Sequence, residues 1–218
     1  MNSKVALVIV DLQEDFCPPD GSLAVSGGRD IVPVINGLLT LPLFDVKIAT
    51  KDWHPADHIS FATNHPGHRP FESFTKVVNP NNPSESYETR LWPVHCVQNT
   101  PGAMLVSELD VGRVDKIIEK GQDKRVEMYS AFADPFVVSQ SELRGYLKNN
   151  YVGKVYVVGL AMDYCVRATA IDAMTEGYDT YIIEDGTKAV DPNEGWMNAK
   201  TEMEAKGIKF VKVHDLVV

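Results

Sequence analysis

The feature that most constrains the fold is a regular alternation of short apolar runs with amphipathic stretches along the chain. Such runs, rich in valine and isoleucine, are typical of buried strands, and the stretches between them have helical spacing. This order predicts βα units that build one mostly parallel sheet. The six predicted strands are Val5–Val10, Val46–Ala49, Val114–Ile118, Val155–Leu160, Thr180–Ile183 and Lys209–Val213. The four predicted helices are Ile31–Leu39, Ser141–Asn149, Val166–Glu176 and Glu194–Ala205.

The length favours a single domain that spans residues 1–218. A chain of this size buries enough surface to need no disulfide framework or structural metal, so any bound metal is expected to be functional. Residues 52–100 interrupt the alternation, since they are rich in Pro, Asn, His and Ser and show little periodicity. Compact domains rarely carry so much irregular chain without a use. We predict an irregular insertion that binds metal and substrate, and the alternative is a surface insertion without a role.

Charge and composition exclude several classes of function. Thirty acidic residues against 21 basic ones give a net charge of -9, which repels phosphate backbones, so no nucleic-acid partner is expected. No stretch approaches the ~20 apolar residues of a membrane span, and no signal-peptide cleavage site follows the first apolar run. The three cysteines lack CxxC spacing and fit a reducing compartment. We expect a cytoplasmic protein, with nucleus or peroxisome as alternatives, and leave a homo-oligomer open.

Reactive side chains follow the ends of four predicted strands. Asp11 follows the first strand, Asp52 and His54 follow the second, Lys120 follows the third and Cys165 follows the fourth. Ligands of an open parallel sheet bind beyond the carboxyl ends of its strands, so these side chains are expected to meet at one edge. Any one of them has an ordinary explanation, because strands stop where polar residues begin. Their convergence predicts an active site.

Cys165 is the candidate nucleophile. It lies at the start of the predicted helix Val166–Glu176, where unpaired backbone N–H groups and the helix dipole stabilise an anion, so we expect a thiolate near neutral pH. The alternative is an inert core cysteine, to which we assign Cys17 and Cys96. A redox role would require one of those two thiols to lie close to Cys165.

A metal site is predicted from Asp52 and His54, which are two residues apart and project from the same face of an extended segment. His95 is the best placed third ligand. One carboxylate and two imidazoles with open positions suit Zn²⁺, or another divalent metal, with waters completing the shell. His214 is assigned to the surface. The rival histidine set is His54, His58, His65 and His68, of which the last two are predicted to lie in a turn.

Seven segments spread over nearly the whole chain carry a family resemblance. They are VIVDLQEDF (8–16), GSL (21–23), TKDWHPADHISFATNHP (50–66), LWPVHCVQNTPGA (91–103), EKG (119–121), YSAF (129–132) and VVGLAMDYCVRATAIDA (157–173). Together they resemble the nicotinamidases of the isochorismatase-like cysteine hydrolases, and DWHP, LWPVHC and YSAF are most similar to the fungal-type branch. The resemblance implies a three-layer α/β/α sandwich around a six-stranded, mostly parallel, Rossmann-like sheet.

The resemblance also implies roles for individual residues. It makes Cys165 the nucleophile, Asp11 the proton carrier and Lys120 the cation between them. It makes Asp52, His54 and His95 the metal ligands, with Zn²⁺ as the expected cofactor. The implied pocket for the nicotinamide ring, whose pyridine nitrogen points toward the metal, is formed by Phe16, Trp92, Tyr129 and Tyr164. The implied oxyanion site consists of the backbone N–H groups of Ala161 and Cys165, with a cis peptide bond between Leu160 and Ala161.

The implied activity is hydrolysis of nicotinamide to nicotinate and ammonia through a cysteine thioester, in the service of NAD salvage, with pyrazinamide as a further substrate. Three alternatives stay open: a relative that acts on ureido or carbamoyl compounds and generally lacks this metal set, a non-catalytic relative, and a redox sensor. The presence of Asp11, Lys120 and Cys165 disfavours a non-catalytic protein. Isochorismatase activity is disfavoured because vinyl-ether hydrolysis does not use a cysteine here.

Overall fold

The structure, a computed structural model, describes residues 3–216; the outermost residues of the predicted domain, 1–2 and 217–218, lie outside the described part. Six strands form one sheet in the order β5-β2-β1-β6-β7-β8, and each neighbouring pair is parallel. The strands are β1 (Lys4–Val10), β2 (Val46–Asp52), β3 (Phe74–Val78), β4 (Ser86–Arg90), β5 (Lys116–Lys120), β6 (Val152–Leu160), β7 (Asp179–Lys188) and β8 (Lys209–Val211). The α-helices are α1 (Val32–Thr40), α2 (Leu143–Asn149), α3 (Arg167–Thr175) and α4 (Glu194–Ala205).

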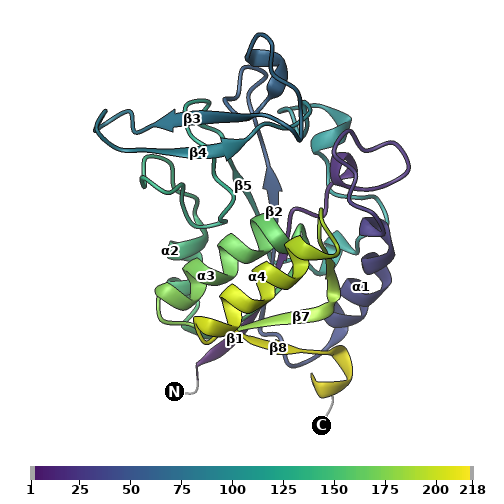
Figure 1. The fold of residues 1–218 in the computed structure, drawn as a ribbon. Coiled ribbons are helices and arrows are strands. Elements are labelled where there is room, and N and C mark those ends of the chain that lie inside the picture. Colours follow the sequence, from purple (N-terminus) through teal and green to yellow (C-terminus); the bar gives the residue numbers. More distant parts are fainter. Residues whose placement is uncertain (1–2, 217–218) are drawn as a thin grey trace.

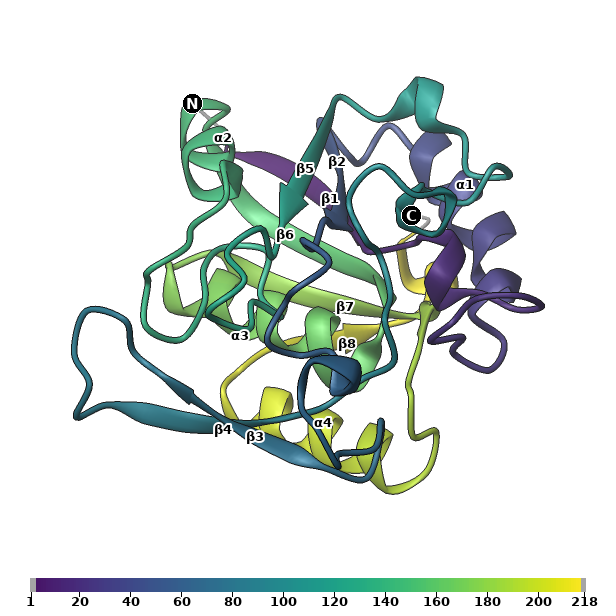
Figure 2. The ribbon, with the colours of Figure 1, turned by 90° about the horizontal axis from the view of Figure 1, so that it is seen from above.

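Helices cover both faces of the sheet, as Figures 1 and 2 show. Successive side chains of a strand point to opposite faces. Leu7 and Ile9 of β1 therefore join the core under α1, whereas Ala6 and Val8 join the core under α2, α3 and α4. The central strands β1 and β6 are apolar on both faces because both faces are buried. The predicted three-layer α/β/α sandwich is confirmed.

The order of the strands places a topological switch point between β1 and β6. From β1 the chain continues to β2 and β5 on one side, and it later returns to β6, β7 and β8 on the other side. Open α/β sheets bind ligands in the crevice outside the carboxyl ends of the strands at such a point. Asp11 directly follows β1, and the segment from Ala161 to Cys165 directly follows β6.

All six predicted strands and all four predicted helices are present, although several boundaries were wrong. The third strand begins at Lys116 and not at Val114, because the N–H of Val114 donates to the carbonyl of Val111 in a 3-10 turn. The second strand continues to Asp52. The strand predicted at 180–183 continues to Lys188, beyond a shift in its register with β6. Among residues 3–216, no helix is long and apolar enough to cross a membrane.

The predicted irregular insertion at 52–100 contains an antiparallel hairpin, β3–β4, that the sequence analysis missed. Its strands, FTKVV and SYETR, carry mostly exposed residues and lack the apolar run by which the other strands were recognised. The turn is closed by Asn79, whose backbone N–H and side-chain amide donate to the carbonyl and carboxylate of Glu85. In Figure 1 the hairpin lies outside the six-stranded sheet, beyond the ends of the central strands.

Gly159 allows β1 and β6 to approach closely where both strands end. Its φ is +108°, and a Cβ atom on it would lie 2.0 Å from the carbonyl oxygen of Val10. Val10 precedes Asp11, and Gly159 lies two residues before Ala161. This contact therefore sets the distance between the ends of β1 and β6 at the switch point. A side chain here would push apart the two strand ends that carry the reactive residues.

We predict that Gly159→Ala lowers the free energy of unfolding by at least about 3 kcal/mol, because the methyl group overlaps the backbone of β1. Urea denaturation measures this change. Gly177→Ala is the matched control, since Gly177 has a φ of +93° and no atom within 4 Å of the added Cβ. This variant should lower the free energy of unfolding by only about 1 to 2 kcal/mol. Equal losses in the two variants would contradict the close approach of the strands.

Candidate active site

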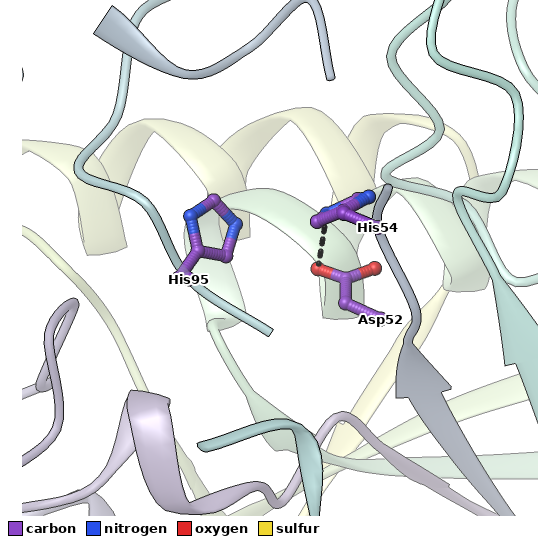
Figure 3. A group of neighbouring side chains, drawn as sticks. All are labelled: Asp52, His54 and His95. Atoms are coloured by element: carbon purple, nitrogen blue, oxygen red, sulfur yellow. Dashed lines mark ion pairs between the residues drawn. The ribbon is translucent and has the colours of Figure 1, made fainter. Parts of the chain in front are cut away.

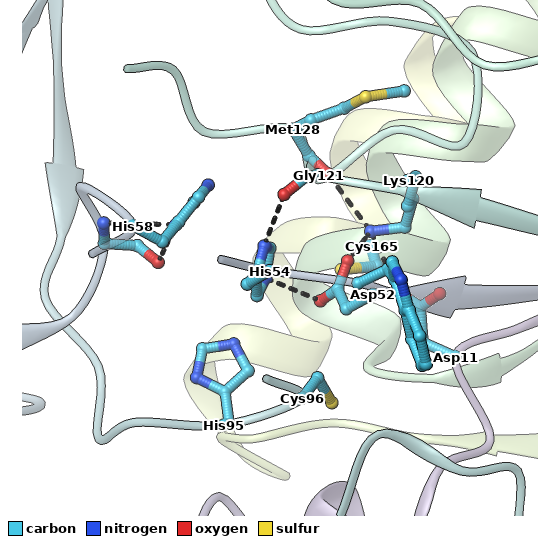
Figure 4. Close-up of polar contacts among 12 residues, drawn as sticks. Asp11, Asp52, His54, His58, His95, Cys96, Lys120, Gly121, Met128 and Cys165 are labelled. Atoms are coloured by element: carbon cyan, nitrogen blue, oxygen red, sulfur yellow. Dashed lines mark hydrogen bonds and ion pairs between the residues drawn. The ribbon is translucent and has the colours of Figure 1, made fainter. Parts of the chain in front are cut away.

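The carboxyl edge of the sheet brings together the reactive residues that the sequence placed after its strands (Figure 4). Asp52 and Lys120 are directly paired across β2 and β5. Ligand atoms of Asp11, Asp52 and Cys165 all lie within 4.8 Å of one another. The expected convergence at one edge is therefore confirmed.

Lys120 is the buried cation that joins these groups. Its Nζ lies 3.0 Å from Oδ2 of Asp11 and 2.5 Å from Oδ1 of Asp52. It also donates to the carbonyl of Met128 at 3.1 Å and lies 3.6 Å from Sγ of Cys165. Burial lowers the pKa of Lys120, but the two carboxylates outweigh burial and hold that pKa well above its usual value. The amine therefore stays protonated between two carboxylates and the thiol.

Asp11 is a buried carboxyl group with an unusual backbone. Its φ of +48° lies in the left-handed region, which aspartate tolerates better than most residues. Thr50 fixes it through two hydrogen bonds: the backbone N–H of Asp11 donates to the Thr50 hydroxyl, which in turn donates to Oδ1 at 2.6 Å. Burial raises the pKa of Asp11 to about 6, against the lowering effect of Lys120. The group is thus ionised near neutral pH and still basic enough to accept a proton.

Cys165 lies in a single π turn, Met162–Val166, that leads into α3. The expected thiolate is wrong for this structure: burial raises the pKa of the Cys165 thiol well above its usual value, although Lys120 lowers it. Cys165 is only 6% exposed, and loss of solvent outweighs the attraction of Lys120. A nucleophilic Cys165 therefore needs a base beside it, and Asp11 is that neighbour.

Asp52, His54 and His95 offer ligand atoms that all lie within 4.8 Å of one another (Figure 3). Each imidazole donates its Nδ1–H to a backbone carbonyl, His54 to Gly121 at 2.8 Å and His95 to Pro93 at 2.7 Å. A neutral imidazole held in this way presents the lone pair of Nε2, which is the usual arrangement of metal-binding histidines. Burial, with a smaller effect of His54, lowers the pKa of His95 to about 4, so that ring is neutral.

The charge and donor types of this cluster fit a divalent cation. Oδ1 of Asp52 contacts Lys120, whereas Oδ2 faces His54 Nε2 at 3.5 Å. Burial raises the pKa of Asp52, but Lys120 and His54 outweigh it and hold that pKa well below its usual value. One anionic oxygen and two imidazole nitrogens match the ligands that zinc and similar metals prefer.

Gly121 is required for this arrangement. It has a φ of +70°, and a Cβ atom on it would lie 2.5 Å from Cε1 of His54. Only glycine lets its own carbonyl accept the His54 Nδ1–H while the ring lies against the backbone. The glycine of the EKG segment thus positions a predicted ligand that lies far away in the sequence.

The rival histidine set does not assemble. His65 is half-buried and its Nε2 bonds to the carbonyl of Ile59, whereas His68 is exposed and its Nδ1 bonds to the carbonyl of Pro66. His58 is buried and stacks on His54 with ring centroids 4.1 Å apart. Its Nδ1 lies 2.8 Å from the Ser60 hydroxyl. His214 is exposed, as predicted.

The predicted ring-binding residues line one pocket next to Cys165. Besides the predicted aromatic residues and Ala161, the wall includes side chains that sequence reasoning missed. The lining residues are Phe16, Leu23, Val25, Asp52, Trp92, His95, Glu127, Tyr129, Ala161, Tyr164, Cys165 and Val190. The peptide bond between Leu160 and Ala161 is cis, as the resemblance implied. Two of the predicted metal ligands, Asp52 and His95, therefore share one small pocket with the Cys165 thiol and the aromatic rings.

Three further residues support the site without having been predicted. Gln13 bonds both backbone polar groups of Asp52, donating from Nε2 to the carbonyl and accepting from the N–H at Oε1, each at 2.8 Å. Thr50 holds Asp11, and Glu127 adds a third buried carboxyl group whose Oε1 accepts the N–H of Met128. Gln13 lies inside the VIVDLQEDF segment, but a glutamine after a strand carries no chemical signal by itself.

The cysteines do not form a redox pair in the described residues, where all three are free thiols. Cys17 and Cys96 pack into the core on the α1 face of the sheet, and Cys165 belongs to the opposite core. Burial raises the pKa of Cys17 to about 12 and that of Cys96 well above its usual value. The assignment of these two residues to inert core positions agrees with this placement.

Comparisons with known proteins match the whole fold. The isochorismatase domain model matches residues 5–215. The chain is 41% identical over 213 residues to the nicotinamidase of Acinetobacter baylyi, covering 98% of this chain and 94% of that protein. The yeast nicotinamidase bound to the inhibitor nicotinaldehyde superposes with a TM-score of 0.89 at 35% identity, over 95% of this chain and 99% of the yeast chain.

A zinc-containing relative has the same fold. The pyrazinamidase of Pyrococcus horikoshii in complex with zinc superposes with a TM-score of 0.73 at 36% identity, over 96% of this chain and 99% of that chain. The resemblance to nicotinamidases is thus confirmed over nearly the full length, and the protein belongs to the isochorismatase family.

Proposed function

We propose that this protein is a nicotinamidase that hydrolyses nicotinamide to nicotinate and ammonia and also deamidates pyrazinamide. The observation that carries the proposal is a pocket lined by Cys165, aromatic rings, Asp52 and His95. The buried residues Asp11 and Lys120 lie against Cys165 and Asp52, and His54 completes the cluster with Asp52 and His95. The nearly full-length likeness to nicotinamidases supports the same substrate class.

In the proposed first half-reaction, Asp11 accepts the proton of the Cys165 thiol and the sulfur attacks the carboxamide carbon. The buried thiol does not ionise alone, and the pKa of about 6 makes Asp11 a suitable base. The backbone N–H groups of Ala161 and Cys165 donate to the oxygen that gains charge. The C–N bond then breaks, Asp11 returns its proton to the nitrogen, and ammonia leaves a nicotinoyl thioester on Cys165.

In the proposed second half-reaction, water replaces ammonia. Asp11, ionised again, accepts a proton from the water as its oxygen attacks the thioester carbon. The C–S bond breaks, the proton on Asp11 returns to the sulfur of Cys165, and the acid that forms releases its remaining proton to solvent as nicotinate. Lys120 keeps its proton throughout and offsets the negative charge that moves between carboxylate and sulfur.

We propose that Asp52, His54 and His95 hold a Zn²⁺ ion in this chain. When bound, such an ion supplies a Lewis acid that can accept the pyridine nitrogen and polarise the ring. The aromatic side chains Phe16, Trp92, Tyr129 and Tyr164 would hold the ring against this cluster, with its carboxamide toward Cys165. We further propose a role in NAD salvage and a cytoplasmic location, which the three free cysteines support.

Cys165→Ala should abolish ammonia release from nicotinamide, with a loss of at least about 10⁴-fold in kcat, because no other group at the site can form the thioester. A coupled ammonia assay measures the rate. Cys17→Ala removes a thiol from the opposite core and should keep most of the activity. Full activity of the Cys165→Ala protein would rule out the mechanism.

The pH dependence of kcat/KM should show the ionisation of the Asp11 carboxyl group. Because its carboxylate must be ionised to accept the thiol proton and its pKa is raised to about 6, kcat/KM should fall below about pH 6. The fall should approach tenfold per pH unit, as expected for one essential group. Initial rates between pH 4.5 and 8, with nicotinamide well below KM, provide the measurement. A flat profile from pH 5 to pH 7 would contradict the role of Asp11 as base.

Gly121→Ala should weaken Zn²⁺ binding by at least about tenfold, since the added methyl group displaces His54. Competition with a chromophoric chelator measures the affinity without using activity. Gly67→Ala is the matched control because Gly67 has a φ of +82° and nothing near its Cβ position. If wild-type protein binds no stoichiometric metal, a superfamily member that acts on a ureido or carbamoyl compound becomes the better proposal.

A further inference from the structure

The β3–β4 hairpin has no role in the proposed reaction, although it contacts the substrate pocket. It is a separate two-stranded sheet in which Thr75 pairs with Thr89 and Val77 with Tyr87. A two-stranded hairpin is marginally stable on its own, so its position depends on what it packs against. In Figure 1 it lies beyond the ends of β2 and β5.

Two side chains of β4 attach the hairpin to the segment 127–129 that forms part of the pocket wall. Tyr87 and Thr89 are two residues apart and project from the same face of β4. The Tyr87 hydroxyl accepts the N–H of Glu127 at 3.0 Å and donates to the carbonyl of Glu127 at 3.1 Å. The Thr89 hydroxyl lies 3.0 Å from the Tyr129 hydroxyl. Thr89 is only 4% exposed, so this contact is shielded from water.

The Tyr129 hydroxyl also receives a hydrogen bond from Trp92, whose Nε1–H donates at 2.9 Å. Since the indole is a donor only, the Tyr129 oxygen accepts there, and the same oxygen forms a second hydrogen bond with the Thr89 hydroxyl, in which either group can donate. The result is a continuous hydrogen-bonded chain from Trp92 through Tyr129 to Thr89. Two of its three members are rings of the substrate pocket.

The same rings pack against Tyr164, the neighbour of Cys165. The Trp92 and Tyr164 centroids are 4.9 Å apart in an edge-to-face arrangement, and the Tyr129 and Tyr164 centroids are 5.4 Å apart. A shift in the tilt of Tyr129 therefore changes the space available to a flat substrate. Contacts between aromatic rings restrict the tilt of Tyr129 only weakly. A hydrogen bond to its hydroxyl restricts the tilt more, because hydrogen bonds require a defined distance and angle.

We propose that Thr89 is a positioning residue for substrate binding: through its hydrogen bond with the Tyr129 hydroxyl, it sets the orientation of Tyr129 and Trp92 around the heteroaromatic ring. The inference rests on the proposed function, because it takes a pyridine carboxamide as the occupant of the pocket. Thr89 acts on the ring and not on the reacting carbonyl. Its loss is therefore expected to change KM far more than kcat.

The test is a set of hydroxyl deletions. Thr89→Val keeps the shape of the side chain and should raise KM for nicotinamide about threefold to tenfold, the range that corresponds to one hydrogen bond, with kcat within about twofold. Thr89→Ser keeps the hydroxyl and should restore KM. Thr75→Val makes the same change at the paired position of β3 and should leave KM unchanged. Thermal unfolding of each variant reports whether it folds.

A double-mutant cycle separates this role from a general structural one. Tyr129→Phe removes the same hydrogen bond from its other end and also the acceptor of the Trp92 indole, so it should raise KM by at least the same factor. In the Tyr129→Phe background, Thr89→Val should have no further effect, because the shared interaction is already gone. Additive effects on KM, or an unchanged KM in folded Thr89→Val, would overturn the inference. Failure of the wild-type chain to release ammonia from nicotinamide would instead overturn the proposed function.

Discussion

The site depends on one buried ammonium group, that of Lys120, held between the carboxylates of Asp11 and Asp52 and facing the thiol of Cys165. Breaking such a buried group of charges by removing one partner leaves an uncompensated charge in a low-dielectric interior. Lys120 therefore contacts both the carboxylate proposed as the base, Asp11, and the carboxylate proposed as a metal ligand, Asp52. In the proposed mechanism Lys120 acts on the thiol proton through Asp11, and its contact with one oxygen of Asp52 leaves the other oxygen for the proposed metal ion.

The fold makes this arrangement by register and by two glycines. Parallel pairing sets Asp52 directly beside Lys120, while the switch point sets the ends of β1 and β6 side by side. Gly159 permits the close approach of those two ends, and Gly121 permits His54 to lie against the backbone after β5. Side chains thus provide the reactive groups, whereas the distances among these groups depend on Gly159 and Gly121, two backbone positions where a Cβ atom does not fit.

Much of this could be predicted from the sequence, because apolar runs mark buried strands and polar residues at their ends must meet at one edge. The hairpin β3–β4 could not, since its strands are largely exposed and show no apolar run. The raised pKa of the Cys165 thiol could not be predicted either, because it follows from burial, and burial depends on packing that no local pattern reveals. The supporting roles of Gln13 and Thr89 arise from contacts between distant segments and leave no local signal.

If thiol, carboxylate, amine and the proposed metal ligands form one working site for a pyridine carboxamide, activity and metal must be coupled. The rate of ammonia release from nicotinamide by the purified chain can be measured before chelation, after chelation and after Zn²⁺ is restored. We expect release by the metal-loaded protein, a large loss after chelation, and recovery with Zn²⁺. No ammonia release under any of the three conditions would contradict this expectation.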